Sequence, residues 1–173
     1  MRGYGDHGFW ETVRDDRRAN PRDPKARSVL FWFRVCQLLI GDISRPRAIS
    51  IPAVIVYRAV TELVLGIELR PKTAVGPGLS IFHGFGLVVN DHAVLGRDVK
   101  LRNGVTIGHQ YAGGPSPRLG EGVEVGANAA IIGDIDVGAH CIVGANAVLT
   151  KSLPPHAVAV GNPARIIRVN ETH

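Results

Sequence analysis

Residues 119–149, LGEGVEVGANAAIIGDIDVGAHCIVGANAVL, repeat one short motif. An aliphatic residue returns at every sixth position, and a glycine follows it in most repeats. This period fits neither an α-helix, which repeats about every 3.6 residues, nor a strand, which repeats every second residue. It is typical of a solenoid, in which short strands meet at corners and each aliphatic side chain points to the axis. We expect the glycines to permit the backbone conformation that the corners need.

The same period extends well beyond this stretch. Aliphatic residues occupy it from Leu69 to Ile81 and, after a two-residue shift, from Val89 to Leu149. A second, usually smaller apolar residue lies four places after most of them. Because stacked coils bury what one coil leaves exposed, residues 67–153 predict a continuous β-solenoid. We assign residues 67–173 to this mainly β domain and its C-terminal tail.

Residues 1–66 have a different pattern. Apolar side chains at helical spacing predict one helix over Ala26–Ile40 and a second over about Pro52–Leu65. Pro52 is compatible with the first turn of the second helix. Residues 1–25 contain two prolines and many charges, so we expect an irregular arm there. The chain is thus predicted to have a short N-terminal α-helical segment, residues 1–66, before the solenoid.

Composition excludes several classes of protein. The chain has 173 residues, of which 45% are hydrophobic, and this indicates a folded domain. Its net charge is +5; basic residues crowd the first thirty positions, and no basic run with interleaved aromatic residues follows them, so we expect no nucleic-acid partner. Cys36 and Cys141 lack the spacing of a disulfide framework or a zinc site. No signal peptide or membrane-spanning run is recognisable, and a cytoplasmic location is expected.

Four segments carry a resemblance to a known family. They are IELRPKTAVGPGLSIFHGFGLVVN (67–90), LRNGVTIGH (101–109), GEGVEVGANAAIIGDIDVGAHCIVGANAVLTKSLP (120–154) and AVGNPARII (159–167). These segments resemble the hexapeptide-repeat acyltransferases, in the serine acetyltransferase branch and especially the type of colanic acid and exopolysaccharide biosynthesis. The resemblance implies a left-handed parallel β-helix with three hexads per coil, a homotrimer, and transfer of an acetyl group from acetyl-CoA without a metal.

The resemblance also implies a catalytic pair. The histidine of the His-Gly step, here His83 followed by Gly84, is the general base of the family. An imidazole titrates near neutral pH and therefore suits proton transfer from a hydroxyl. The family places an aspartate fifteen residues earlier, and this chain has Glu68 there, so Glu68 is expected to orient the ring. The alternative, a corner histidine satisfied by the backbone, remains open from the residues alone.

Further site residues follow from the same resemblance. Gly108, Ala127 and Ala145 match the small positions that flank the pantetheine arm, since small side chains let a slim thioester approach the backbone. Lys151 and Arg165, with Arg168, lie where cations pair with the phosphates of the coenzyme. His109 precedes the interrupting segment QYAGGPSPR, which is expected to form a projecting loop that reaches the active site.

The acceptor is where the chain departs from serine acetyltransferase. The positions that hold the amino acid in that enzyme are Phe82, Pro115 and Ser116 here. These side chains carry no charge, so the two charged groups of an amino acid would lack partners on burial. We therefore expect a sugar hydroxyl of an exopolysaccharide or its precursor, contacted by Phe82, His109 and Ser116. Serine O-acetyltransferase is the alternative. The apolar, basic N-terminal helices are compatible with peripheral contact at the inner face of the membrane.

Two interpretations outside acyl transfer compete with this one. Carbonic anhydrases of the same architecture bind zinc through three histidines, but His83, His92, His109 and His140 lack the paired spacing of that site. A purely structural solenoid is the other, and failure to bind coenzyme A would support it.

Overall fold

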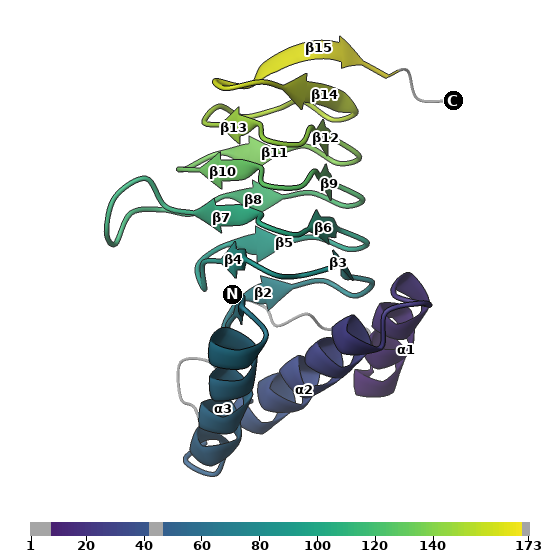
Figure 1. Cartoon of the computed structure of the whole chain (residues 1–173), viewed down its shortest axis with the longest axis vertical. Helices are drawn as coiled ribbons and strands as arrows, with labels where there is room; N and C mark the ends of the chain where they lie inside the picture. Colours follow the sequence, from purple (N-terminus) through teal and green to yellow (C-terminus); the bar gives the residue numbers. More distant parts are fainter. Residues whose placement is uncertain (1–7, 42–46, 171–173) are drawn as a thin grey trace.

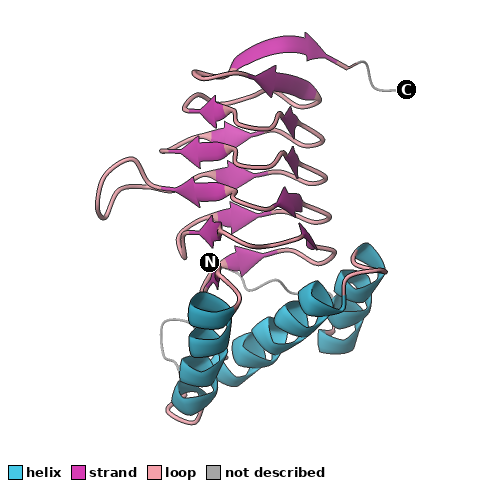
Figure 2. Cartoon of the chain, viewed as in Figure 1, coloured by secondary structure: helices cyan, strands magenta, loops and turns pink. Residues whose placement is uncertain are grey.

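The computed structural model describes residues 8–41 and 47–170. Helices lie at one end of a tall stack of short strands, and the C-terminal strands lie at the other end (Figures 1 and 2). The helical elements are α1 (Phe9–Ala19), α2 (Pro24–Ile40), α3 (Ser50–Arg58) and the π-helix η1 (Ala59–Val64). Asp23 caps α2 by accepting a hydrogen bond from the Ala26 backbone N–H, 2.9 Å away.

The strands form three sheets that make the three faces of a prism. The first face holds β1 (Ile67–Leu69), β4 (Leu87–Val89), β7 (Thr106–Gly108), β10 (Ala130–Ile132) and β13 (Val148–Leu149). The second holds β2 (Ala74–Val75), β5 (Val94–Leu95), β8 (Arg118–Leu119) and β11 (Asp136–Val137). The third holds β3 (Ser80–Phe82), β6 (Lys100–Arg102), β9 (Glu124–Val125), β12 (Ile142–Val143), β14 (Ala157–Val160) and β15 (Arg165–Val169).

Each of the first four coils contributes one strand to each face, and the last coil adds only an isolated bridge at Leu153 to the second face. Successive coils pair in parallel; Leu69 pairs with Val89 and Val89 with Ile107. Among the described strands, only β15 runs antiparallel, against β14. The repeated aliphatic residues fill the axis and are almost fully buried. The predicted mainly β fold, a parallel β-helix with an N-terminal helical segment, is confirmed.

The glycines after the aliphatic residues have a different role from the one that we expected. They do not have positive φ angles; Gly76 and Gly96 are examples. A Cβ on Gly76 would lie 2.6 Å from the Gly96 carbonyl carbon in the next coil. Glycine is required there because the next backbone lies too close for a side chain. The left-handed corner conformation falls two residues later, as at Gly78 and Asp98.

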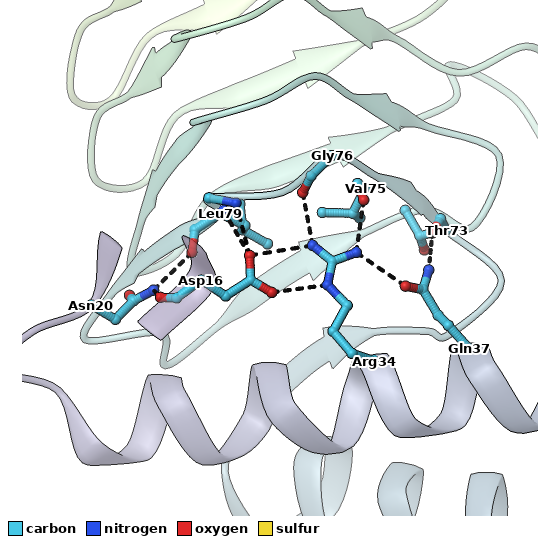
Figure 3. A network of polar contacts seen from close by, with 9 residues as sticks. Asp16, Asn20, Arg34, Gln37, Thr73, Val75, Gly76 and Leu79 are labelled. Carbon is cyan, nitrogen blue, oxygen red and sulfur yellow. Dashed lines mark hydrogen bonds and ion pairs between the residues drawn. The ribbon is translucent and has the colours of Figure 1, made fainter. Parts of the chain in front are cut away.

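The expectation of an irregular arm was wrong over Phe9–Ala19, which form α1; residues 1–7 of that arm lie outside the described residues. Asp16 and Arg34 form a buried ion pair between α1 and α2, with Asp16 Oδ2 2.8 Å from Arg34 Nε (Figure 3). Arg34 donates to the carbonyls of Val75 and Gly76, and Asp16 accepts from the Gly78 N–H. The first coil has no coil beneath it, so these side chains satisfy backbone groups that would otherwise lack partners.

Asn20 and Gln37 extend this contact. The Asn20 amide donates to the Leu79 carbonyl and accepts from the Ile81 N–H, at 2.8 and 3.0 Å. Gln37 donates to the Thr73 carbonyl. The sequence pattern did not reveal α1 because this helix is held by buried polar groups, and hydrophobic periodicity does not report these.

The second helical segment, expected over about Pro52–Leu65, is close to its expected position but less regular. It begins at Ser50, and its last turns are the π-helix η1. Side chains of Leu30, Phe33 and Tyr57 join the same apolar core as the first coil. Within the described residues, no helix has the length and apolar character that a membrane span needs.

Candidate active site

His83 lies at a corner of the solenoid, directly after β3. Its φ angle of 65° is left-handed, and Gly84 follows at 56°. Its side chain is exposed. The His83 carbonyl accepts hydrogen bonds from Lys25 Nζ at 2.6 Å and from the Phe85 N–H at 2.7 Å. A non-glycine residue in this backbone region is uncommon and is held by its surroundings. The imidazole is therefore presented to solvent from a tightly built turn.

Glu68 lies in the middle of β1, opposite Val88 of β4. Its carboxylate pairs with Arg70 Nη2 at 2.9 Å, and Arg70 Nε lies 3.6 Å from Glu62 Oε1. Across residues 8–41 and 47–170, no hydrogen bond joins Glu68 to His83. Orientation of the His83 ring by Glu68 remains a prediction, and in this structure Arg70 holds the carboxylate.

One edge of the prism, here called the His83 edge, comprises the corners at residues 83–86, 103–105, 126–129 and 144–147. Backbone hydrogen bonds tie these corners together: Gly104 N–H to the Phe85 carbonyl at 2.9 Å, and Asn146 N–H to the Ala127 carbonyl at 2.8 Å. The predicted coenzyme positions Ala127 and Ala145 lie on this edge with His83. The structure therefore places Ala127 and Ala145 on the third and fourth corners of the edge whose first corner carries His83, and the second corner carries Asn103.

Gly108, His109, Ser116 and Lys151 lie on or beside a second edge, here called the loop edge, with corners at residues 90–93, 109–117, 133–135 and 150–152. Gly108 ends β7, and His109 begins the loop that projects from the side of the solenoid before β8 (Figure 1). Lys151 follows β13 on the same edge. Arg165 lies at the end of the stack in β15, is exposed, and donates to the Ala164 carbonyl.

Asn90 joins the two ends of the projecting loop, and sequence reasoning missed it. Its side-chain amide nitrogen lies 3.1 Å from His109 Nδ1, and its oxygen accepts from the Ser116 hydroxyl at 2.9 Å. The same oxygen accepts from the His92 N–H. Ser116 is 4% exposed, so its hydroxyl holds the end of the loop against Asn90 and is not presented to solvent. Asparagine in VVND signals a turn, but a turn signal does not specify partners nineteen and twenty-six residues away.

The predicted acceptor residue Phe82 lies beside His83 at the end of β3. It is 38% exposed, and the Arg102 guanidinium carbon lies 5.3 Å from the centroid of its ring. Phe82 and Arg102 are paired in the register of β3 and β6. The sequence did not indicate this contact because it joins neighbouring coils.

Other nucleophile and metal chemistry has no support in the described residues. Burial raises the pKa of the Cys36 and Cys141 thiols, so the reactive thiolate is disfavoured at both. No group of three or more His, Cys, Asp or Glu side chains within residues 8–41 and 47–170 is arranged to hold a metal ion.

Sequence comparisons point to acetyltransferases. The bacterial transferase hexapeptide (six repeats) family matches residues 116–151. Serine acetyltransferase 2 of Arabidopsis thaliana is 33% identical over 96% of this chain, and the chain spans about half of that relative, 54%. The putative colanic acid biosynthesis acetyltransferase WcaB of Escherichia coli is 40% identical, with 66% of this chain and 72% of the relative covered. Serine acetyltransferase of Mycobacterium tuberculosis is 32% identical, with 90% and 70% covered.

Solved structures give the same result. The soybean serine acetyltransferase apoenzyme matches 94% of this chain and 70% of its own, with a TM-score of 0.78 and 30% identity. The Neisseria gonorrhoeae serine acetyltransferase matches with the same TM-score of 0.78, 28% identity, and 95% and 67% covered. Because these matches cover the helices as well as the solenoid, the likeness extends over nearly all of this chain.

Proposed function

This chain belongs to the hexapeptide-repeat acetyltransferases that include the serine acetyltransferases, and from that membership we propose that it transfers an acetyl group from acetyl-CoA to a sugar hydroxyl of an exopolysaccharide or its precursor. The observation that carries the proposal is the His83 edge. An exposed imidazole stands at one corner, and the small residues Ala127 and Ala145 occupy corners above it. That arrangement suits a slim thioester arm running along the edge toward a base.

In the proposed reaction, His83 accepts the proton of the acceptor hydroxyl as its oxygen attacks the thioester carbonyl. The new bond is the ester C–O bond, and the bond that breaks is the thioester C–S bond. The imidazolium then returns its proton to the departing sulfur, so the ring ends as it began. The rigid left-handed corner limits how far the ring must reorganise between the two proton transfers.

Binding of the coenzyme is assigned to residues on both edges. Ala127 and Ala145 line the path of the arm on the His83 edge, and Gly108 lines it from the loop edge. Lys151 and Arg165 are both exposed and carry the charge that phosphate groups require.

The acceptor assignment rests on the residues beside His83. Phe82 offers part of an apolar ring face and Arg102 a set of N–H donors, which suit a hydroxylated ring. Within the described residues, Arg102 forms no ion pair with a carboxylate, so its guanidinium suits an acceptor other than the ammonium end of an amino acid. Ser116 is the least supported of the acceptor residues because its hydroxyl already bonds to Asn90.

Serine O-acetyltransferase is the alternative function. It is favoured by one observation: the Arabidopsis serine acetyltransferase matches 96% of this chain, helices included. An acceptor assay separates the two. Purified protein receives acetyl-CoA with L-serine or with a panel of methyl glycosides and sugar phosphates, and thiol release and product mass are measured. Transfer to a glycoside that is lost in His83→Asn supports the proposal. Saturable acetylation of L-serine restores the alternative, and absence of coenzyme A binding favours a structural solenoid.

We assign a homotrimer as the active assembly. The two edges border opposite sides of the same face, so within one chain the strands of that face separate the two sets of site residues. A second copy that places its loop edge against the His83 edge would bring them into one cleft. Mixing His83→Asn subunits with subunits whose residues 110–115 are replaced by Gly-Gly should restore activity. Failure to recover activity, or a single-chain mass by light scattering, contradicts the assembly.

We also assign the N-terminal helices to the surface of an anionic membrane, at its cytoplasmic face. Three adjoining hollows on these helices grade from cationic to apolar: the middle one shares Arg17 and Arg27 with the cationic hollow and Ser28 with the apolar one. Their other lining residues include Arg14, Arg18, Trp10, Phe31, Trp32, Val56 and Val60. Basic side chains beside exposed apolar ones favour an anionic bilayer surface.

Sedimentation with phosphatidylglycerol vesicles tests this membrane contact, with phosphatidylcholine vesicles as the control. Binding only to the anionic vesicles, weakened in Trp32→Ser, supports the assignment. Equal sedimentation with both, or a larger assembly that buries the helices, contradicts it.

A further inference from the structure

Two cations flank His83 without acidic partners in the described part of the chain. Lys25 Nζ lies 2.6 Å from the His83 carbonyl oxygen. Arg102 stacks on Phe82, with 5.3 Å between its guanidinium carbon and the ring centroid. Within residues 8–41 and 47–170, neither Lys25 nor Arg102 forms an ion pair with a carboxylate. The surface beside the candidate base therefore carries uncompensated positive charge.

Neighbouring cations are different, because carboxylates neutralise them. Lys100, two residues before Arg102 on β6, lies 2.6 Å from Glu124 Oε1. Arg70 pairs with Glu68 and with Glu62. A surface arginine with no acidic partner keeps the planar set of N–H donors that matches a carboxylate or phosphate, and stacking on an aromatic ring leaves those donors available.

The chemistry of the two groups is complementary. A guanidinium stacked on a ring keeps its N–H groups at its edge, where they can donate in pairs to a carboxylate or phosphate. The Lys25 ammonium has three protons, and one donates to the His83 carbonyl. Each group can therefore donate charge-assisted hydrogen bonds to an anion near the His83 corner, Lys25 from the His83 carbonyl and Arg102 from the ring of the preceding residue.

We propose that Arg102 and Lys25 form an anion subsite beside His83, so that the acceptor is a sugar with a carboxylate or phosphate group close to the hydroxyl that is acetylated. This inference rests on the proposed acetyl transfer, and Arg102 is its specificity-determining residue. Lys25 also supports the His83 corner through the carbonyl, so its substitution would affect catalysis and specificity together. Arg102 is the better residue to test.

The experiment compares acceptors that share a glucose ring and carry no anionic group or one of two different anionic groups. Methyl glucoside is neutral, methyl glucuronoside carries a carboxylate, and glucose 1-phosphate carries a phosphate. The two charged acceptors distinguish the two sources of the anion. We expect kcat/KM to favour one charged acceptor over the neutral one by about ten- to hundredfold, mainly through KM, as a charge-assisted hydrogen bond contributes.

Variants assign this preference to Arg102. In Arg102→Gln the ratio of charged to neutral kcat/KM should fall to about one, and Arg102→Lys should retain part of it because the charge remains without the paired donors. Lys100→Gln is the matched control, because Lys100 lies on the same strand and its charge is already neutralised. It should keep the full preference. Thermal unfolding of all variants checks that each remains folded.

The outcomes separate this inference from the function on which it rests. Equal rates for charged and neutral acceptors, or an unchanged preference in Arg102→Gln, overturn the anion subsite and leave acetyl transfer standing. If no acceptor is acetylated, titration of methyl glucuronoside and glucose 1-phosphate, followed by ligand-observed NMR, decides whether the anion subsite exists. Binding that is lost in Arg102→Gln then supports the subsite while the transferase proposal fails. No preferential binding of either anion overturns the subsite.

Discussion

The two edges of the solenoid that carry candidate site residues are held together in different ways. On the His83 edge, left-handed corners stack directly, and backbone hydrogen bonds connect each coil to the next. On the loop edge, the repeat is interrupted, and the side chain of Asn90 joins His109 to Ser116. Backbone contacts depend little on residue type, whereas the Asn90 contacts depend on a single side chain. The proposed base therefore sits on the more rigid frame, and the loop is the more easily altered part.

The largest expected effect is the loss of His83. His83→Asn should lower kcat by about 10² to 10⁴-fold, the usual contribution of a general base, with coenzyme A affinity nearly unchanged. Asparagine is preferred to alanine because it tolerates the left-handed φ of 65° at this corner. His140→Asn is the matched control, since His140 has a φ of 57° on a different edge. Near-normal turnover in His83→Asn would show that the base lies elsewhere.

A second prediction concerns the stability of the two edges. Gly104 has a φ of 67°, and a Cβ there would collide with the Asn128 side chain of the next coil. Gly113, in the projecting loop, has a φ of 76°, and a Cβ there would meet no atom within 4 Å. Both alanine variants bear the left-handed strain, but only Gly104→Ala also disturbs a stacked corner.

Gly104→Ala should therefore be destabilised by about 2–3 kcal/mol and Gly113→Ala by about 1 kcal/mol. Thermal unfolding at a fixed protein concentration measures the difference. Equal losses in the two variants would mean that the corners of the His83 edge are not closely packed.

The third prediction tests how the loop is held. Asn90→Ala removes both side-chain links and should lower kcat/KM by about tenfold, because the loop is no longer positioned, with faster proteolysis within residues 110–117. Asn90→Asp is the comparison variant, since its oxygen can still accept from Ser116 while the donor to His109 is lost. The kcat/KM and the proteolysis rate of Asn90→Asp should lie between those of the wild type and Asn90→Ala. Unchanged proteolysis of Asn90→Ala would indicate that the loop is held by other contacts.

A smaller effect is expected at Glu68, on the face between the two edges. Glu68→Gln should lower kcat by about threefold to tenfold. The His83 base remains in this variant and loses only the carboxylate that orients its ring and stabilises its positive charge. The His83→Asn, Glu68→Gln double variant should be no worse than His83→Asn alone if Glu68 acts through His83. Additive losses would mean that Glu68 acts independently.

The smallest expected effect is a dependence of stability on pH through Glu62. The hydrogen bond from Arg58, at 2.8 Å, lowers the pKa of the Glu62 carboxyl below its ordinary value of 4.5. A carboxyl whose pKa is lowered in the folded state stabilises that state at pH values above its ordinary pKa. This contribution is lost as the pH falls from the ordinary pKa through the lowered one. It should amount to about 0.5–1 kcal/mol, since Arg58 is partly exposed. Thermal unfolding of Glu62→Gln and wild type should therefore converge as the pH falls below 4.5.

Much of the architecture was predictable from the sequence because a six-residue period has one simple structural solution. The inward positions of Leu119, Val125 and Ile131 follow directly from the repeat, and each is buried. The helix α1 was not predictable in this way, since Asp16 and Asn20 hold it by polar contacts to the first coil. The site shows the same division: the motif around His83 identifies the candidate base, but nothing local to it predicts that Arg102 lies over Phe82.

By itself, the sequence determined the coil, its period, and which residues point to the axis, because these follow from local spacing. It also pointed to the histidine at the corner after β3. Only the tertiary structure decided which corners share an edge, so that His83 aligns with Ala127 and Ala145 while His109 and Ser116 lie on the other side of a face. It also decided the partners of Arg34, Glu68, Asn90 and Arg102. The physical reason is that stacking joins residues a whole coil apart, and the partner of a polar side chain depends on that stacking rather than on its neighbours in the chain.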